Sequence, residues 1–129
     1  MTFYYQKLFV KLILKGFKKV YFLLKIKFDT IQYFNKLKKS NSYFHTFLNK
    51  ESLAVGVLFL RPGEKDTQEP HESDEIYYII DGNGFLQINK KSHPIKKDQI
   101  YFVAKNTPHH FYGNTKNLSA LYFFGGSDS

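Results

Sequence analysis

The chain has 129 residues and a formal net charge of +8, with 14 phenylalanines, 10 tyrosines and no cysteine. This length predicts one domain that can bury a hydrophobic core, and the lack of cysteine excludes a disulfide framework and any thiolate ligand or nucleophile. The basic charge is uneven, because residues 1–40 hold ten lysines against one aspartate, whereas residues 41–129 hold nine basic and ten acidic residues. The charge change predicts a basic leader followed by a nearly neutral domain.

The leader, residues 1–28, interleaves lysines with apolar and aromatic residues. Its lysines include those at positions 7, 11, 15, 18 and 25, and this spacing predicts a basic amphipathic helix over residues 1–28. Gly16 disfavours one continuous helix. The longest uninterrupted apolar run, residues 20–24, is far shorter than the roughly 20 residues of a bilayer span, and it does not resemble a signal peptide.

Three interpretations of the leader remain open. It can pack on its own domain or on a partner subunit, lie on an anionic membrane surface, or be a leader peculiar to this chain. Its aromatic residues between lysines also permit nucleic-acid contact, more weakly. We prefer packing on protein, because the aromatic content of the leader matches that of the rest of the chain. The expected localisation is cytoplasmic, with peripheral membrane contact through residues 1–28 as the alternative.

Residues 29–129 predict a short helix followed by strands. Asp29 or Thr30 can cap a helix over residues 29–39. Such short strands with turn residues between them indicate an antiparallel sandwich or barrel, so the fold class is all-β with an N-terminal helical extension. The predicted strands cover residues 43–48, 53–60, 75–80, 85–90, 93–96, 99–103, 109–112 and 118–124.

Two stretches carry residues suited to metal binding. Glu69, His71 and Glu75 lie within seven residues, and in an extended chain these odd-numbered positions share one face. His109 follows a strand-like run and a turn signal at residues 106–108. Imidazole and carboxylate donors that converge on one point can hold a divalent ion such as Mn, Fe(II), Ni or Zn while leaving coordination positions open.

The first stretch resembles the first sequence motif of the cupins. Gly63, His71, Glu75 and Gly82 stand where that motif has its glycine, second histidine, glutamate and final glycine. Glu69 stands where the motif has its first histidine. The sequence of this stretch is similar to that of a group of small single-domain cupins, many of which have no assigned reaction.

The second stretch resembles the second cupin motif. His109 stands on the single histidine of that motif, and Pro108 precedes it. Lys97, Ala104 and Asn106 replace its usual glycine, proline and glycine. Asparagine tolerates a left-handed turn well, so its presence at position 106 is a mild departure, whereas lysine at position 97 is more surprising. The resemblance covers residues 29–126.

The resemblance implies an antiparallel double-stranded β-helix, the jelly-roll barrel of the cupins, over residues 29–129. It also implies a homodimer and a divalent metal in the mouth of the barrel, with Glu69, His71, Glu75 and His109 as ligands. Two carboxylates beside two histidines favour Mn or Fe(II). Alternatively, Glu69 faces solvent, and the other three residues form a facial triad.

The function expected from these residues is metal binding, and two hypotheses for its use remain open. The protein is a metal-dependent dioxygenase or isomerase that acts on a small molecule, or it is a non-catalytic cupin module that holds a small ligand or metal and is attached to a membrane surface or partner by its basic leader. The sequence identifies neither a substrate nor a reaction.

Overall fold

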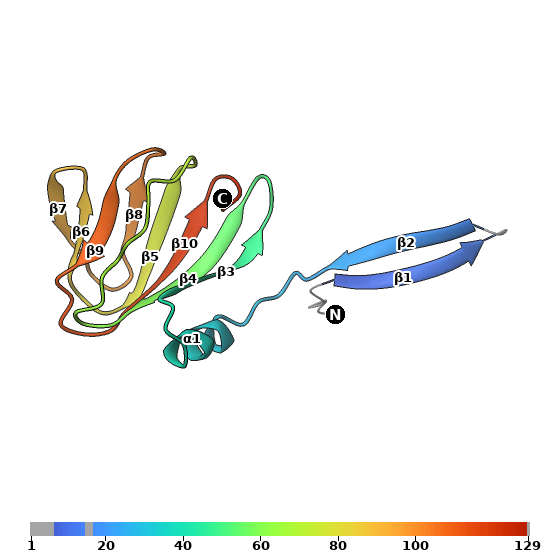
Figure 1. Ribbon diagram of the computed structural model, residues 1–129, viewed down its shortest axis with the longest axis horizontal. Helices are drawn as coiled ribbons and strands as arrows, with labels where there is room; N and C mark the ends of the chain where they lie inside the picture. Colours follow the sequence, from blue (N-terminus) through green and yellow to red (C-terminus); the bar gives the residue numbers. More distant parts are fainter. Residues whose placement is uncertain (1–6, 15–16, 129) are drawn as a thin grey trace. The chain divides into compact units, whose positions relative to one another are not determined.

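The computed structural model describes residues 7–14 and 17–128, with side chains from residue 25 onward. These residues divide into two compact units, the first ending at Thr30 and the second beginning at Ile31. Figure 1 labels the elements of both units.

The first unit contains an antiparallel strand pair, β1 (Lys7–Leu14) and β2 (Phe17–Leu24). The predicted leader helix over residues 1–28 is therefore wrong for these two segments, and its parts at residues 1–6, 15 and 16 lie outside the described residues. A spacing of four lysine positions, as between Lys7 and Lys11, fits one face of a strand as well as one face of a helix. The β-branched and aromatic residues of the leader favour the strand.

The boundary between the units falls after the first residue of α1 (Thr30–Lys38), the helix predicted for residues 29–39, so the rest of this helix belongs to the second unit. Tyr33, Phe34 and Leu37 form its buried face. The guanidinium group of Arg61 donates to three main-chain carbonyls at the end of the helix, of which that of Leu37 is the nearest at 3.0 Å. These bonds satisfy carbonyls that the helix itself leaves unpaired. In residues 7–14 and 17–128, no helix has the length and apolar character needed to cross a bilayer.

Eight strands follow the helix and form two antiparallel sheets (Figure 1). The larger sheet has five strands in the order β3-β4-β10-β5-β8, and the smaller has three in the order β7-β6-β9. This arrangement confirms the predicted all-β fold. The strands are β3 (Phe44–Asn49), β4 (Ala54–Leu60), β5 (Glu75–Asp81), β6 (Phe85–Ile88), β7 (Lys91–Pro94), β8 (Ile100–Val103), β9 (His109–Tyr112) and β10 (Leu118–Phe124).

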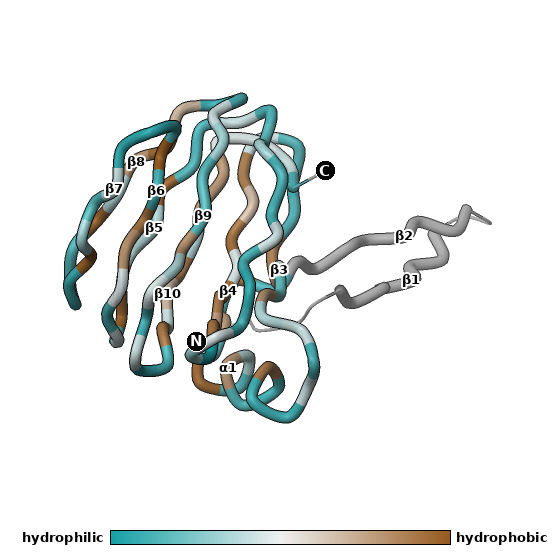
Figure 2. Tube along the Cα trace, turned by 60° about the vertical axis from the view of Figure 1, so that its left-hand side comes forward, coloured by the Kyte–Doolittle hydropathy of each residue, from teal (hydrophilic) through white to brown (hydrophobic). Residues whose placement is uncertain are grey.

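The hydrophobic core lies between the two sheets. Alternate side chains of β5 point inward, so that Glu75, Tyr77 and Ile79 are buried. They meet Leu86 of β6 and Phe111 of β9, which come from the smaller sheet. Figure 2 shows hydrophobic residues concentrated along the strands of this unit, with hydrophilic residues in most of the connecting loops. Packing of the two sheets on this core therefore fixes the relative positions of β5 and β9, and with them the first residue of each strand.

The turns explain why the second motif tolerates its substitutions. Asp98 and Asn106 adopt positive φ angles of 68° and 59°, so the left-handed positions are taken by residues with short polar side chains. Lys97 is not among the residues with positive φ, and the turn is accommodated at its neighbour Asp98. Neither substitution therefore disrupts the fold of this region.

Candidate metal centre

Three of the four predicted ligands converge. His71 lies in the loop between β4 and β5, Glu75 is the first residue of β5, and His109 is the first residue of β9. Their donor atoms all lie within 4.8 Å of one another. Glu75 Oε1 is 3.0 Å from His109 Nε2 and 3.8 Å from His71 Nε2. The spacing of His71 and Glu75 in the first motif thus brings their side chains to one point.

The cluster joins elements that are distant in sequence. β5 belongs to the five-stranded sheet and β9 to the three-stranded sheet, so Glu75 and His109 meet only when the sheets pack together. The main-chain amide of Asn106, in the turn before β9, donates a 2.6 Å hydrogen bond to the carbonyl of His71. This bond holds the loop that carries one histidine against the turn that precedes the other.

Glu75 has the burial and the lack of partners expected of a metal ligand. Its Oε1 is buried and accepts no hydrogen bond, although His109 Nε2 lies only 3.0 Å away. The close approach does not have hydrogen-bond geometry. A buried carboxylate oxygen that accepts no hydrogen bond is costly. A protonated His109 can compensate it by an ion pair, and a cation between Glu75 and the two imidazoles would compensate it equally. The donor set of two imidazole nitrogens and one carboxylate oxygen therefore fits a divalent transition metal.

His109 has the tautomer that metal binding requires. Its Nδ1 lies 2.8 Å from the carbonyl of Thr107, which can only accept a hydrogen bond, so Nδ1 carries the proton in the neutral ring. The lone pair of Nε2 then faces Glu75 and is available to a metal. Burial lowers the pKa of His109, but Glu75 and the Thr107 carbonyl outweigh this effect and raise the pKa overall.

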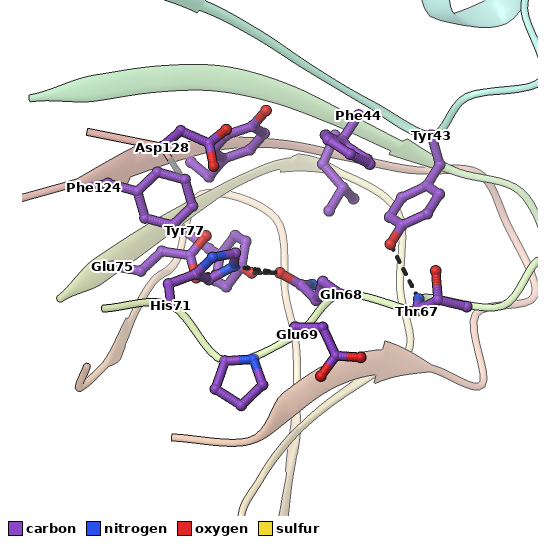
Figure 3. A pocket seen from close by; sticks show the side chains of 13 residues that line it. Tyr43, Phe44, Thr67, Gln68, Glu69, His71, Glu75, Tyr77, Phe124 and Asp128 are labelled. Atoms are coloured by element: carbon purple, nitrogen blue, oxygen red, sulfur yellow. Dashed lines mark hydrogen bonds and ion pairs between the residues drawn. The ribbon is translucent and has the colours of Figure 1, made fainter. Parts of the chain in front are cut away.

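Two further polar side chains complete the cluster. The Tyr77 hydroxyl donates to Gln68 Oε1 at 2.8 Å and lies 3.1 Å from His109 Nε2. Gln68 Oε1 also lies 3.3 Å from His71 Nε2 (Figure 3). Burial raises the pKa of Tyr77 well above its usual range, and the nearby charge of Glu75 adds to this effect, so the phenol is a neutral hydrogen-bond donor.

Gln68 is oriented by a buried carboxylate, Asp66. Asp66 Oδ2 accepts from Gln68 Nε2 at 2.6 Å and from the main-chain amide of Phe111 at 2.8 Å. Its Oδ1 accepts from the Tyr43 hydroxyl at 3.0 Å. Sequence reasoning missed the roles of Asp66 and Gln68, although both stand in the first motif region, because polar residues before a strand read equally well as loop residues.

Glu69, the fourth predicted ligand, is not brought into the cluster. Its side chain is exposed, and Figure 3 shows its carboxylate directed away from His71 and Glu75. The prediction relied on alternation in an extended chain, but residues 61–74 form no strand. Gln68, rather than Glu69, therefore reaches His71, as in the alternative with Glu69 in solvent.

A pocket of about 340 Å³ opens beside the cluster. Its volume suits a small-molecule ligand. Its walls combine polar residues of the cluster with aromatic residues from β3 and β10. The residues that line the pocket are Tyr43, Phe44, Leu58, Thr67, Gln68, Glu69, Pro70, His71, Glu75, Tyr77, Tyr122, Phe124 and Asp128. A molecule in this pocket would touch the cluster at one side and aromatic rings at the other.

The chain is similar to known proteins in both sequence and structure. An uncharacterised protein of Streptomyces coelicolor is 25% identical over 83 residues, which cover 64% of this chain and 79% of that protein. An RmlC-like cupin from Methanocaldococcus jannaschii with a double-stranded β-helix fold superposes with a TM-score of 0.61 at 19% identity, covering 69% of this chain and 86% of that one. A predicted oxalate decarboxylase from Thermotoga maritima gives a TM-score of 0.57 at 24% identity, covering 64% and 78%.

The structural matches establish the fold alone. Their sequence identities are too low to support a statement about function. The family follows from the sequence itself. The sequence model of the cupin domain family matches residues 56–124. These residues make up more than half of the chain and include His71, Glu75 and His109. Three features of the chain agree with this match: the two sequence motifs, the two antiparallel sheets, and the cluster of two histidines and one glutamate. The chain therefore belongs to the cupin family.

Proposed function

We propose that the protein binds one divalent transition metal ion through Nε2 of His71, Oε1 of Glu75 and Nε2 of His109. The observation that carries this proposal is the buried Glu75 Oε1, which accepts no hydrogen bond although it lies between two imidazoles. Two histidines and one carboxylate with open positions are typical of Fe(II) sites. Fe(II) and Mn are the preferred ions, with Ni and Zn as alternatives.

The residues around the three ligands would bind and orient a small molecule. Tyr77 can donate its hydroxyl proton to an oxygen of that molecule in place of Gln68, and Gln68 Oε1 can then accept a hydrogen bond from the molecule. The metal, when bound, supplies a Lewis acid that polarises a coordinated oxygen. Aromatic residues form one wall of the pocket beside the site.

The proposed activity is that of a metal-dependent dioxygenase or isomerase acting on a small molecule. The pocket beside the cluster supports it, because a substrate could reach the open positions of the metal. The second candidate is a non-catalytic cupin module that holds a small ligand. Consumption of candidate substrates by the metal-loaded protein, compared in air and under nitrogen, distinguishes an oxygenase, an isomerase and a protein without turnover.

Elemental analysis tests metal binding directly. The protein is stripped with a chelator, reconstituted separately with Fe(II) under nitrogen and with Mn, and desalted. We expect about one ion per chain. His71→Ala and His109→Ala should lower the metal affinity by more than about 100-fold, since each removes a ligand.

Two matched variants serve as controls. Glu69→Ala removes a nearby exposed carboxylate, and His110→Ala removes the histidine next to His109, so both should retain the metal. Metal content that stays far below one ion per chain after reconstitution, or equal retention by the ligand variants and the controls, would contradict the proposal.

A further inference from the structure

One wall of the pocket, which begins beside His71, is aromatic and acidic. Phe124 places its ring 4.5 Å from that of His71, and Tyr122 lies 5.5 Å from Phe124, between ring centres. The Tyr122 hydroxyl is 2.8 Å from Thr46 Oγ1, which donates in turn to the Asp128 carboxylate. A continuous series of contacts therefore connects His71 to the Asp128 carboxylate through Phe124, Tyr122 and Thr46.

Asp128 is held in place at the pocket by its main chain. Its amide donates to Asn49 Oδ1 at 2.9 Å, and its carbonyl accepts from Asn49 Nδ2 at 3.0 Å. Figure 3 shows Asp128 beside Phe124, on the opposite side of the pocket from Gln68. The carboxylate is therefore part of the pocket wall.

Phe44 adds an aromatic surface with no evident role in the fold. It lines the pocket and has 49% of its surface exposed. Tyr43 packs edge-on against it, with ring centres 5.2 Å apart. The exposed aromatic surface of the pocket therefore comes from the segment where β3 begins, because Tyr122 and Phe124 of β10 are only 4% and 3% exposed.

The charge of the pocket is opposite to that of the chain. The lining residues include three carboxylates, Glu69, Glu75 and Asp128, and neither lysine nor arginine, although the chain carries a net charge of +8. An anionic group on a ligand could therefore be neutralised only by the metal. Aromatic faces beside a carboxylate suit the opposite charge, and they are especially suited to cations covered with methyl groups.

We infer that the pocket binds a small zwitterion, with its carboxylate on the metal and a methylated ammonium group against Phe44, Tyr43 and Asp128. This inference rests on the proposed function for the carboxylate end of the ligand only. The ammonium end depends on the aromatic rings and Asp128, which are present with or without the metal. Polyanionic ligands such as phosphate esters are disfavoured by the same lining.

The ammonium end can be tested on the metal-free protein with choline. Its matched control is 3,3-dimethylbutan-1-ol, which has the same shape without the charge. Titration calorimetry should show choline binding at least about fivefold more tightly than the alcohol, since the two differ only in the attraction of the charge to the rings and to Asp128. Equal affinity would overturn the inference, whatever the metal does.

The whole ligand can be tested on the metal-loaded protein. The probes are trimethylammonium carboxylates with one, two or three methylene groups between charge and carboxylate, each compared with its tert-butyl isostere. At least one zwitterion should bind at least about fivefold more tightly than its isostere. If the protein takes up metal but every isostere binds as well as its zwitterion, the inference fails and the proposed function stands.

Two variants test the assigned residues. Asp128→Asn keeps the shape and the main-chain bonds to Asn49, and Phe44→Leu keeps an apolar side chain. Each should reduce the preference for the charged probe by about threefold or more and leave the neutral isostere unaffected. Asp81→Asn and Phe85→Leu make the same changes at exposed residues outside the pocket and should have no effect.

The variants also separate the two proposals. Metal content should be unchanged in Asp128→Asn and Phe44→Leu, because neither residue belongs to the ligand cluster. If both variants retained the full preference for choline over the alcohol, the cation would bind elsewhere and the assignment to this pocket would be overturned.

Discussion

Asp66 Oδ2 accepts a 2.6 Å hydrogen bond from Gln68 Nε2, and this contact determines which end of the Gln68 amide faces the candidate metal site. With the amide nitrogen directed to Asp66, Oε1 is left to accept from Tyr77 at 2.8 Å. The same carboxylate accepts from the main-chain amide of Phe111 in β9. One buried residue therefore connects the loop before β5 to the strand that begins with His109.

Asp66→Asn should lower both metal affinity and stability. An asparagine can present only one acceptor oxygen, so one pair of donors loses its partner: either Gln68 Nε2 and the Phe111 amide, which share Oδ2, or the Tyr43 hydroxyl and the Gln68 main-chain amide, which share Oδ1. An unsatisfied buried donor costs about 1–3 kcal/mol. We expect a loss of that size in chemical denaturation of the metal-free protein and about a 10-fold loss of metal affinity. Asp74→Asn, at an exposed loop carboxylate, is the control. Unchanged metal affinity would show that the orientation of Gln68 does not matter.

The stability of the metal-free protein should depend on pH through His109. Its folded pKa is raised, because Glu75 and the Thr107 carbonyl outweigh the lowering by burial. The protonated ring therefore stabilises the folded state below the unfolded value of about 6.5, and this contribution is lost as the pH rises through the folded pKa. The stability of wild type relative to His109→Asn should decrease across this window, while His110→Asn should follow wild type.

The metal-loaded protein should show the opposite trend in the same window. A metal competes with the proton for His109 Nε2, so metal affinity and the stabilisation that it gives should increase with pH. Thermal unfolding of the two forms between about pH 5.5 and 8.5 measures both effects, since the range brackets the unfolded histidine value. Parallel curves for the two forms would contradict a role of His109 as ligand.

Gly56→Ala should destabilise the fold and disturb the pocket. A Cβ atom at position 56 would lie 2.1 Å from Cζ of Tyr122 and 2.6 Å from the carbonyl oxygen of His45, which is too close without movement. Overpacking of this kind costs about 1–3 kcal/mol. Gly125→Ala is the matched control, because its nearest neighbour would be 3.8 Å away. Equal unfolding midpoints in denaturant would show that Tyr122 can move freely.

We propose that the second unit pairs with another copy of itself, as predicted from the sequence. Ile76 of β5 lies opposite Phe102 of the edge strand β8, and together with Ile100 these side chains are 39%, 58% and 64% exposed. This apolar surface has the composition expected of a two-fold contact between identical faces. Light scattering should give a dimer mass, and Phe102→Glu should give a monomer with unchanged metal content. A monomeric wild type would rule the pairing out.

Deletion of residues 1–27 should leave metal binding intact, because every residue of the candidate site lies in the second unit. Binding of the full chain to anionic vesicles, weakened by salt, would favour the membrane interpretation of the leader, since each lysine near such a surface contributes about 1 kcal/mol. A lower melting temperature of the truncated protein without vesicle binding would favour packing on protein. Loss of metal from the truncated protein would contradict the separation of the two units.

The sequence by itself determined the elements of the second unit and the residues of the candidate metal cluster. The periodic strands and the helix near residue 30 were predicted close to their observed bounds, because alternation and turn residues are local signals. His71, Glu75 and His109 were identified because the spacing of both motifs, and their resemblance to cupins, survives the substitutions at Lys97 and Asn106. Those substitutions are tolerated because Asp98 and Asn106 take up the turns.

Only the tertiary structure decided which neighbouring side chains contact His71, Glu75 and His109. Gln68 replaces Glu69 beside His71, because residues 61–74 do not alternate as a strand does and Asp66 holds the Gln68 amide from the far side. The leader likewise forms β1 and β2, because a lysine spacing of four suits both a helix and a strand and cannot distinguish them. In both places the local pattern was ambiguous, and contacts between residues distant along the chain or paired across strands removed the ambiguity.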